Sequence, residues 1–421
     1  NKKQPFITWG YHQLWHGDIK RKDLDSLFPD SPVIIWHRSF HEVILNTAAL
    51  ELLGITYDGV KDNHEIDWEK GHFWEVGAQY VLANKGMHFI FSPDNYGQGM
   101  NNFVEMMHRG GITSAMDMGV GIFGDAEGEI ALIHNAMNKK STPARLVLTP
   151  IITYFLAAGD TPEQALTKIN AWKAASTDKV IFDDHFKLMI DGAIFSGLSQ
   201  YNFPGYLDGH EGVWLAPLKT TYQWAEFFWN EGYQLHAHVN GDKSTDALID
   251  FVNKLYESKS RVDHRLVLEH FAFATDDQLK KLSELGVLIS ANPYYQYILS
   301  DVYAEKWLGE DRARNMVPLG SAKRENIRFA LHSDAPMAPL SPLTLIWAAV
   351  NRETINGNKN FASQKINVHD ALKAVTIDAA WMMRREDSIG SIRAGKNADF
   401  VILEKDPYRV SPSVIKDIPV W

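Results

Sequence analysis

The sequence contains no cysteine among its 421 residues. This absence excludes disulfide bonds, thiolate zinc sites, cysteine nucleophiles and iron–sulfur clusters. Any metal or acid–base chemistry must therefore come from its 17 histidines and its 52 acidic residues. The lack of cysteine leaves the compartment unknown, and we favour the cytoplasm.

The sequence also lacks an excess of positive charge and any long apolar run. It has 42 basic and 52 acidic residues, a net charge of −10, which disfavours nonspecific binding to nucleic acid. No apolar run approaches the ~18 residues that a membrane-spanning helix needs. We expect a small-molecule substrate as partner, with no nucleic acid and no membrane, and a homodimer as one option for assembly.

Apolar and amphipathic segments alternate between residues 101 and 385. Strand candidates lie at 111–118, 144–155, 185–190, 233–239, 265–273, 286–292 and 328–332, and helices are predicted between most of them. This alternation is typical of a parallel sheet with right-handed crossovers. About eight such units form a (β/α)8 TIM-type barrel, which is the α/β fold we predict. Because only seven candidates are present, the eighth strand either comes from residues 1–100 or lies outside the sequence.

The two flanking regions differ from this pattern. Residues 1–100 are rich in aromatic side chains and predict a cap, with a strand over 33–36, a helix over 47–53 capped by Asn46, and irregular structure over 58–99. The Trp-rich stretch 224–229 has helical spacing, which favours packing. After Asn367 we expect one long helix to about residue 385, then a strand over 399–404.

Chemically useful side chains stand near the ends of four strand candidates: Lys187, His238, His270 and Asp334. The carboxyl ends of barrel strands meet at one rim, where active sites lie. Imidazole and carboxylate ligands suit a divalent metal, most fittingly zinc, with one or two ions. An ammonium would repel the metal, so Lys187 fits this site only if it is carboxylated. Asp334 would also act in catalysis as the proton acceptor for water.

For each of these four residues taken alone, a structural role is the alternative to metal binding. A single histidine at a strand end is more often a hydrogen-bonded structural residue, and Lys187 alone would pair best with Asp191. The occurrence of all four in this order favours the metal site. Six further residues are weaker candidates for orienting the ligands or contacting a substrate: His236, Glu269, His332, His41, Trp36 and Glu75.

The order Lys, His, His, Asp resembles the amidohydrolase superfamily of metal-dependent hydrolases. Finer motifs resemble amidohydrolase family 3, which includes YtcJ-like proteins and N-substituted formamide deformylases. These motifs are KLMIDG from Lys187, HVNGD from His238, LEH ending at His270, HSDAP from His332 and GSIRAGKNAD from Gly390. The resemblance covers essentially the whole chain.

The resemblance implies a register and a reaction. It places Lys187 on barrel strand four, His238 on five, His270 on six and Asp334 on eight. It also divides the chain into an insertion or cap between strands 1 and 2 (1–100), strands 2–8 of the barrel (101–385), and the barrel exit with a remnant of a small β-sandwich (386–421). The implied activity is hydrolysis of a C–N bond, of the amide or N-substituted formamide type, by a metal-activated water.

One family motif is missing, and this leaves other functions open. The family carries a His-x-His pair after strand one, whereas the only such pair here is His236–His238, assigned to strand five. We therefore expect the N-terminal part of the enzyme to be absent and metal occupancy to be partial. The alternatives are a catalytically inactive amidohydrolase-like binding or regulatory protein, and a metal-free barrel hydrolase with Glu269 and Asp334 as its carboxylate pair.

Overall fold

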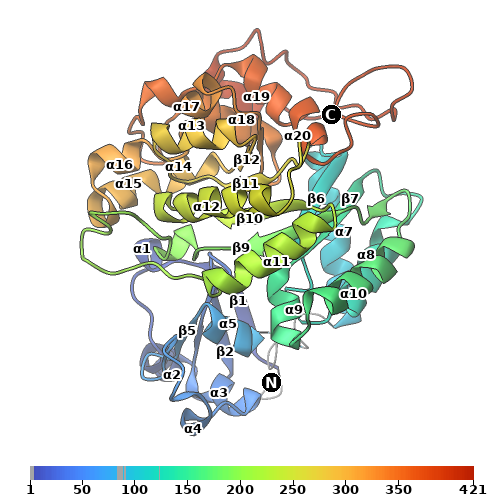
Figure 1. Ribbon diagram of the computed structural model, residues 1–421. Helices are drawn as coiled ribbons and strands as arrows, with labels where there is room; N and C mark the ends of the chain where they lie inside the picture. Colours follow the sequence, from blue (N-terminus) through green and yellow to red (C-terminus); the bar gives the residue numbers. More distant parts are fainter. Residues whose placement is uncertain (1–3, 83–88, 90–91, 123) are drawn as a thin grey trace.

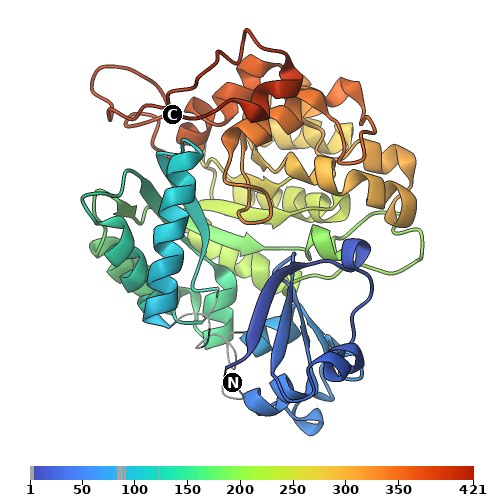
Figure 2. The same cartoon turned by 180° about the vertical axis from the view of Figure 1, so that it is seen from behind.

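A small N-terminal sheet lies against one side of a larger α/β body (Figure 1). This computed structural model describes residues 4–82, 89, 92–122 and 124–421. In that part of the chain, none of the helices combines the length and the apolar character needed to cross a lipid bilayer. We call residues 4–82 the cap and the remainder the body. In both views the C-terminal segment lies at the opposite end of the molecule from the cap (Figures 1 and 2).

The strands of the body are all parallel and follow one another in space in chain order. They are β6 (Ser114–Val120), β7 (Arg145–Pro150), β8 (Val180–Ile181), β9 (His185–Met189), β10 (Gln234–Val239), β11 (Val267–His270), β12 (Leu288–Ala291) and β13 (Phe329–Leu331). An isolated bridge between Ile151 and Lys187 links the sheet β6-β7-β8 to the sheet β9–β13. This arrangement confirms the predicted TIM-type α/β fold. Among the described strands, β6 pairs only with β7 and β13 only with β12, so hydrogen bonds do not close the barrel.

Helices between the strands cover the outside of the body. The longer ones are α7 (Pro93–Arg109), α8 (Ala126–Met137), α10 (Pro162–Ala174), α11 (Leu218–Asn230), α12 (Asp242–Ser258), α13 (Asp276–Glu284) and α18 (Pro342–Asn351). Because helices cover them, β9 to β12 are buried along their whole length. The Phe186 ring of β9 stacks on Phe228 of α11 with centroids 3.8 Å apart. Trp224 and Trp229 of α11 are buried in the core, which confirms their predicted packing role.

Shorter helices complete the connections after β7 and β12. They are α9 (Ile152–Ala158), α14 (Tyr294–Ile298), α15 (Ser300–Val302), α16 (Glu310–Arg314) and α17 (Leu319–Arg324). The predicted strand over 144–155 is therefore wrong in its second half, where β7 ends and α9 begins. The whole segment is one apolar run, and hydrophobicity alone does not separate a buried strand from a buried helix.

The C-terminal region differs from its prediction in two places. The expected long helix is two short ones, α19 (Val368–Ala374) and α20 (Ile377–Met382), separated at Thr376, whose φ and ψ of −128° and −100° are not helical. Residues 399–404 are not a strand, since only Leu403 makes an isolated bridge, to Val420. An apolar run becomes a strand only where a partner strand supplies the ladder.

The cap is built on a five-stranded sheet in the order β1 (Phe6–Tyr11), β2 (Val33–His37), β3 (Glu42–Leu45), β5 (His72–Trp74) and β4 (Ile66–Asp67). Its helices are α1 (Gln13–His16), α2 (Arg21–Leu27), α3 (Thr47–Leu53), α4 (Tyr57–Val60) and α5 (Val76–Val81). The predicted strand over 33–36 and the helix capped by Asn46 are confirmed. All the described strands of the cap pair among themselves, so none of them enters the barrel sheets.

The predicted irregular stretch over 58–99 is wrong where the structure describes it. It contains β4, β5, α5 and the start of α7, while residues 83–88 and 90–91 lie outside the described part. Elements of two to six residues are too short for a periodic pattern to be visible. The predicted boundary at residue 100 falls inside α7, which packs on α8; the division into domains stays a prediction.

Candidate functional site

Strand register places several predicted site residues on one face of the body sheet. Lys187 of β9 is the register partner of His236 on β10, and His238 is the partner of Glu269 on β11. Register partners on neighbouring strands project to the same face, as do residues two apart on one strand. Lys187, His236, His238 and Glu269 therefore share one face of the sheet.

His270 joins these residues through an unusual backbone conformation. It follows Glu269 directly, so regular alternation would turn it to the opposite face. Its φ of 79°, followed by 53° at Phe271, lies in the left-handed region and interrupts that alternation. The rings of His238 and His270 consequently lie edge to face with centroids 4.3 Å apart.

Asp334 completes this group from the turn after β13. It also has a left-handed backbone, with φ of 50°, and its Oδ2 lies 3.8 Å from His270 Nδ1. The Tyr295 hydroxyl bridges the pair, at 3.1 Å from His270 Nδ1 and 3.3 Å from Asp334 Oδ2. The structure thus brings together His238, His270 and Asp334, three of the four predicted ligands.

Lys187 is buried beside this group, with 3 % of its surface exposed. Its ammonium makes no hydrogen bond or ion pair with any residue that the structure describes. Burial lowers the pKa of Lys187, although the Glu269 and Asp334 carboxylates act in the opposite direction. A buried cationic group without a close partner is costly, so the neutral amine is favoured here more than in water.

The alternative pairing of Lys187 with Asp191 does not form in this structure. The Asp191 carboxylate accepts hydrogen bonds from the Ser244 hydroxyl at 2.7 Å and from three backbone amides, those of Gln200, Asn240 and Gly241. Burial raises the pKa of Asp191 to about 6 despite these bonds. Asp191 therefore ties the loop after β9 to the start of α12.

Burial favours the neutral form of four histidines near the strand ends. It is the largest cause of the lowered pKa of His236, His238, His270 and His332. Neutral imidazole is the form that binds metals. The donor types thus fit a divalent ion, but no three His, Asp or Glu side chains of the described residues are gathered as ligands around one point.

Next to His238, His270 and Asp334, hydrogen bonds link the side chains of His185, His236 and Glu269. His236 Nδ1 is 2.8 Å from Glu269 Oε1, and His236 Nε2 is 3.1 Å from His185 Nδ1. Burial would raise the pKa of Glu269, but the hydrogen bond with His236 and the charge of Lys187 lower it to about 2. His332 Nδ1 lies 2.7 Å from the Ser290 hydroxyl and 3.7 Å from Glu269 Oε2.

Sequence reasoning missed several members of this arrangement. Tyr295 and Ser290 belong to none of the motifs described above. Asn240, whose Nδ2 is 2.9 Å from His238 Nε2, lies inside the HVNGD motif but was not singled out as a site residue. His185 could have been found, because it stands two residues before Lys187 and thus projects to the same face of β9.

The cap contributes two of its three candidate residues. His41 Nδ1 is 2.6 Å from Glu75 Oε2, and the His41 ring lies 6.4 Å from the His238 ring. Burial lowers the pKa of His41, but the Glu75 carboxylate outweighs this effect and raises it overall. Trp36 is instead buried in the cap core and donates its Nε1 to the Phe40 carbonyl at 3.3 Å.

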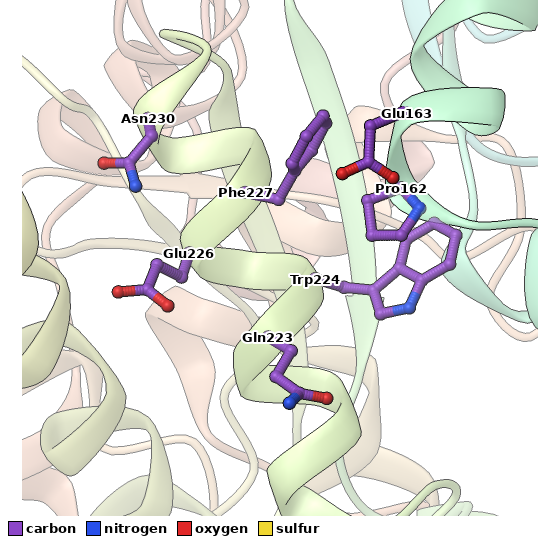
Figure 3. Close-up of a pocket in the computed structure, with 7 residues that line it drawn as sticks. All are labelled: Pro162, Glu163, Gln223, Trp224, Glu226, Phe227 and Asn230. Carbon is purple, nitrogen blue, oxygen red and sulfur yellow. The ribbon is translucent and has the colours of Figure 1, made fainter.

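A separate surface pocket lies between α10 and α11 (Figure 3). It is lined by Pro162, Glu163, Gln223, Trp224, Glu226, Phe227 and Asn230. None of these is a predicted site residue, and the pocket holds no histidine.

Comparison with known proteins identifies the family of the chain. Residues 10–421 match the model of the amidohydrolase family. The chain belongs to the amidohydrolase family. It is therefore a hydrolase that acts on C–N bonds, and its predicted membership is confirmed.

Two relatives of known sequence span nearly all of the chain. An N-substituted formamide deformylase from Arthrobacter pascens is 24% identical over 417 residues, which are 95% of this chain and 73% of the relative. YtcJ of Bacillus subtilis is 23% identical over 96% of this chain and 75% of its own length. An uncharacterized metal-dependent hydrolase from Pyrococcus horikoshii has the same fold, with a TM-score of 0.72 and 21% identity over 97% of this chain and 78% of that protein.

Proposed function

We propose that this amidohydrolase cleaves an amide bond, of the N-substituted formamide type, with a divalent metal ion, most fittingly zinc. The observation that carries the proposal is the convergence of His238, His270 and Asp334 beside the buried, unpaired Lys187. The relative from Arthrobacter pascens, named for deformylation of N-substituted formamides, supports the substrate class. The Pyrococcus protein, described as metal-dependent, supports the metal.

His238, His270 and Asp334 would hold the metal, with Lys187 as a further ligand after carboxylation. A neutral amine adds to carbon dioxide and loses a proton to form a carbamate anion. Burial, which disfavours the ammonium form of Lys187, favours this reaction. The anion would remove the repulsion between a lysine and a cation, and His236 and Glu269 would keep the strand ends in place by their hydrogen bond.

When bound, a divalent ion polarises a carbonyl group and lowers the pKa of a water molecule to roughly 7. Asp334 is suited to the proton transfers because 40 % of its side chain is exposed, in contrast to the buried Glu269. Its carboxylate would accept the proton from the attacking water and pass it to the leaving nitrogen. His270 and Tyr295 contact Asp334 and would orient it.

A metal-free mechanism with Glu269 and Asp334 as the acid–base pair is less well supported. A general acid needs a raised pKa, whereas the hydrogen bond with His236 and the charge of Lys187 hold the pKa of Glu269 at about 2. Glu269 would remain ionised and bound to His236 throughout the working pH range.

The test uses His238→Ala and His270→Ala, each compared with His264→Ala. His264 is also buried, but it precedes β11, at the opposite end of the strand from His270. We expect both site variants to lose bound zinc, measured by elemental analysis, and to lose detectable hydrolysis of a panel of formamides, amides and hydantoins. The control should keep both. Retention of zinc and of the rate in the site variants would contradict the proposal.

A further inference from the structure

Two cap residues far apart in the sequence form a dyad at the boundary with the body. His41 lies in the turn between β2 and β3, and Glu75 lies between β5 and α5. Besides the 2.6 Å contact between their side chains, the Glu75 amide donates to the His41 carbonyl at 2.8 Å. Glu75 thus contacts both the side chain and the backbone of His41, and Glu75 is almost fully buried.

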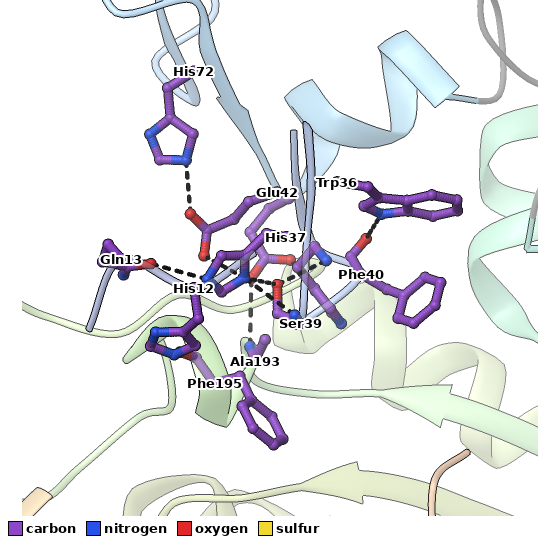
Figure 4. Close-up of polar contacts among 12 residues, drawn as sticks. His12, Gln13, Trp36, His37, Ser39, Phe40, Glu42, His72, Ala193 and Phe195 are labelled. Carbon is purple, nitrogen blue, oxygen red and sulfur yellow. Dashed lines mark hydrogen bonds and ion pairs between the residues drawn. The ribbon is translucent and has the colours of Figure 1, made fainter. Parts of the chain in front are cut away.

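The dyad is attached directly to the body. The second oxygen of Glu75 accepts the Ala193 amide at 3.4 Å, and Ala193 stands two residues after Asp191 in the loop that follows β9. The Arg38 guanidinium, three residues before His41, donates to the Met337 carbonyl at 3.0 Å, in the loop that carries Asp334. Figure 4 shows Ala193 and Phe195 of the body facing the cap residues. The cap therefore contacts the loop after β9, the strand that carries Lys187, and the loop after β13, which carries Asp334.

The backbone around the dyad is strained. Phe40 has φ of 64° and Glu75 has φ of 46°, although neither is glycine. Such conformations cost on the order of 1 kcal/mol or more and persist where the surroundings enforce them, commonly at functional sites. Here both strained residues serve to place one side chain, that of His41.

Only one of the two nitrogens of the His41 ring is engaged by a residue that the structure describes. Glu75 occupies Nδ1, while Nε2 has no partner among the residues that the structure describes, and 24 % of the side chain is exposed. This exposed imidazole edge lies on the cap side of His238, with ring centroids 6.4 Å apart. Phe40, its neighbour in sequence, packs against both the cap core and the body core. Its ring lies edge to face with Trp36, with centroids 4.7 Å apart, and is tilted against Trp9 at 5.2 Å.

We propose that His41 is a catalytic residue whose Nε2 hydrogen-bonds the amide group of the substrate, and that Glu75 is the residue that positions it. Phe40 and Trp9 would form the adjacent wall for an apolar or aromatic substituent on the amide nitrogen. This inference rests on the proposed function, since it concerns the same substrate. It assigns to the cap a direct part in catalysis in addition to that of the barrel rim.

The experiment compares two replacements of His41 that differ in where they place an amide group. The glutamine of His41→Gln places its NH₂ group close to the position of the former Nε2. The asparagine of His41→Asn is shorter and places its amide group only near the position of the former Nδ1. We expect His41→Asn to lower kcat/KM for an N-aryl formamide such as formanilide by about 10²–10³-fold, the effect of removing one donor in other hydrolases. His41→Gln should recover about tenfold of that loss. Zinc content should not change in either variant, because His41 is not a ligand.

The cap contains a matched control and a test of the positioning residue. His72 Nε2 contacts Glu42 Oε2 at 2.6 Å, and 30 % of the His72 side chain is exposed, so this is a similar pair on the same sheet (Figure 4). His72→Asn should leave kcat/KM within about twofold. Glu75→Gln should lower kcat more than it raises KM and should shift the pH profile, which a purely structural role would not do. Equal losses in His41→Asn and His72→Asn, or loss of zinc in His41→Asn, would overturn the proposal.

A second measurement separates failure of this inference from failure of the proposed function. If wild type hydrolyses no amide in the panel, the proposed function fails, and His41 is then tested by ligand contact alone. Acetohydroxamate, an amide analogue, is titrated into protein labelled with ¹⁵N-histidine, and the His41 Nε2 resonance is assigned from His41→Asn. A shift of that resonance that is absent for His72 supports the contact, whereas an unperturbed resonance on saturation overturns it.

Discussion

Buried titratable residues of the cap make its stability depend on pH. His12 is fully buried, with Nε2 3.0 Å from the Phe195 carbonyl, and burial lowers its pKa from 6.5 to about 3. Burial would raise the pKa of Glu42, but His37 and His72 lower it from 4.5 to about 2. In both cases the unfolded chain takes up a proton at a higher pH than the folded chain does.

We therefore expect acid to destabilise the protein in two overlapping windows. Between pH 6.5 and 3 the unfolded state binds more protons at His12, and between pH 4.5 and 2 it does so at Glu42, so stability falls as the pH falls through each window. The slope approaches about 1.4 kcal/mol per pH unit for one such group. Urea unfolding at pH 7.0, 6.0 and 5.0 measures the combined contribution of His12 and the other buried histidines whose pKa is lowered.

The variant His12→Gln isolates the contribution of His12 to the pH dependence of stability, because the glutamine amide can still donate to the Phe195 carbonyl. Its stability should change less between pH 6.5 and 5 than that of wild type. The control is His64→Gln, at an exposed cap position, and it should keep the wild-type slope. An unchanged slope in His12→Gln would show that His12 does not cause the acid sensitivity.

At the scale of elements, Asn46 joins three pieces of the cap. Its Oδ1 accepts the Ala49 amide at the start of α3 and the Val33 amide at the start of β2, both at 2.9 Å. Its Nδ2 donates to the carbonyls of Phe28 and Ser31. Because Asn46 is fully buried, water cannot replace these bonds.

Asn46→Ala should therefore lower the free energy of unfolding by much more than the removal of a helix cap does. A cap alone is worth about 1 kcal/mol, and each backbone group left buried without a partner adds about 1–3 kcal/mol. We expect a loss of about 3 kcal/mol or more in the free energy of unfolding, measured by urea denaturation. Asn367→Ala is the matched control, since Asn367 caps α19 at an exposed position through one bond at 2.8 Å; it should lose about 1 kcal/mol. Equal losses would contradict the central role of Asn46.

At the scale of the whole molecule, β6 differs from the other barrel strands. Six of its seven residues are partly exposed, whereas β9, β10, β11 and β12 are buried throughout. Among the described strands β6 has a single neighbour, β7, while β10 and β11 have two each. An edge strand with few buried contacts opens at a lower free energy than a central strand.

Hydrogen exchange should reveal this difference directly. Followed by mass spectrometry, peptides covering 114–120 should exchange at least tenfold faster than peptides covering 234–239, which corresponds to about 1.4 kcal/mol in opening free energy. Bound zinc should slow the central strands further if their histidines are ligands. Equal protection of β6 and β10 would show that β6 is covered as fully as the central strands.

The strands and most candidate ligands could be predicted from sequence because both depend on local order. Apolar runs bounded by helices located β6, β7 and β9 to β13 to within a few residues, and the polar residues at their ends pointed to one rim. Two neighbouring elements were missed for the same reason: α9 and the short elements of 58–99 do not show a distinct period.

The sequence alone determined the fold class, the family and the kinds of side chain at the strand ends. Tertiary structure decided how they meet. His270 faces His238 because packing holds its backbone at φ of 79°, and Glu75 reaches His41 across 34 residues of sequence. The same packing leaves Lys187 buried without a partner. Left-handed backbone conformations and long-range pairs depend on the sum of many distant contacts, so no local sequence pattern encodes them.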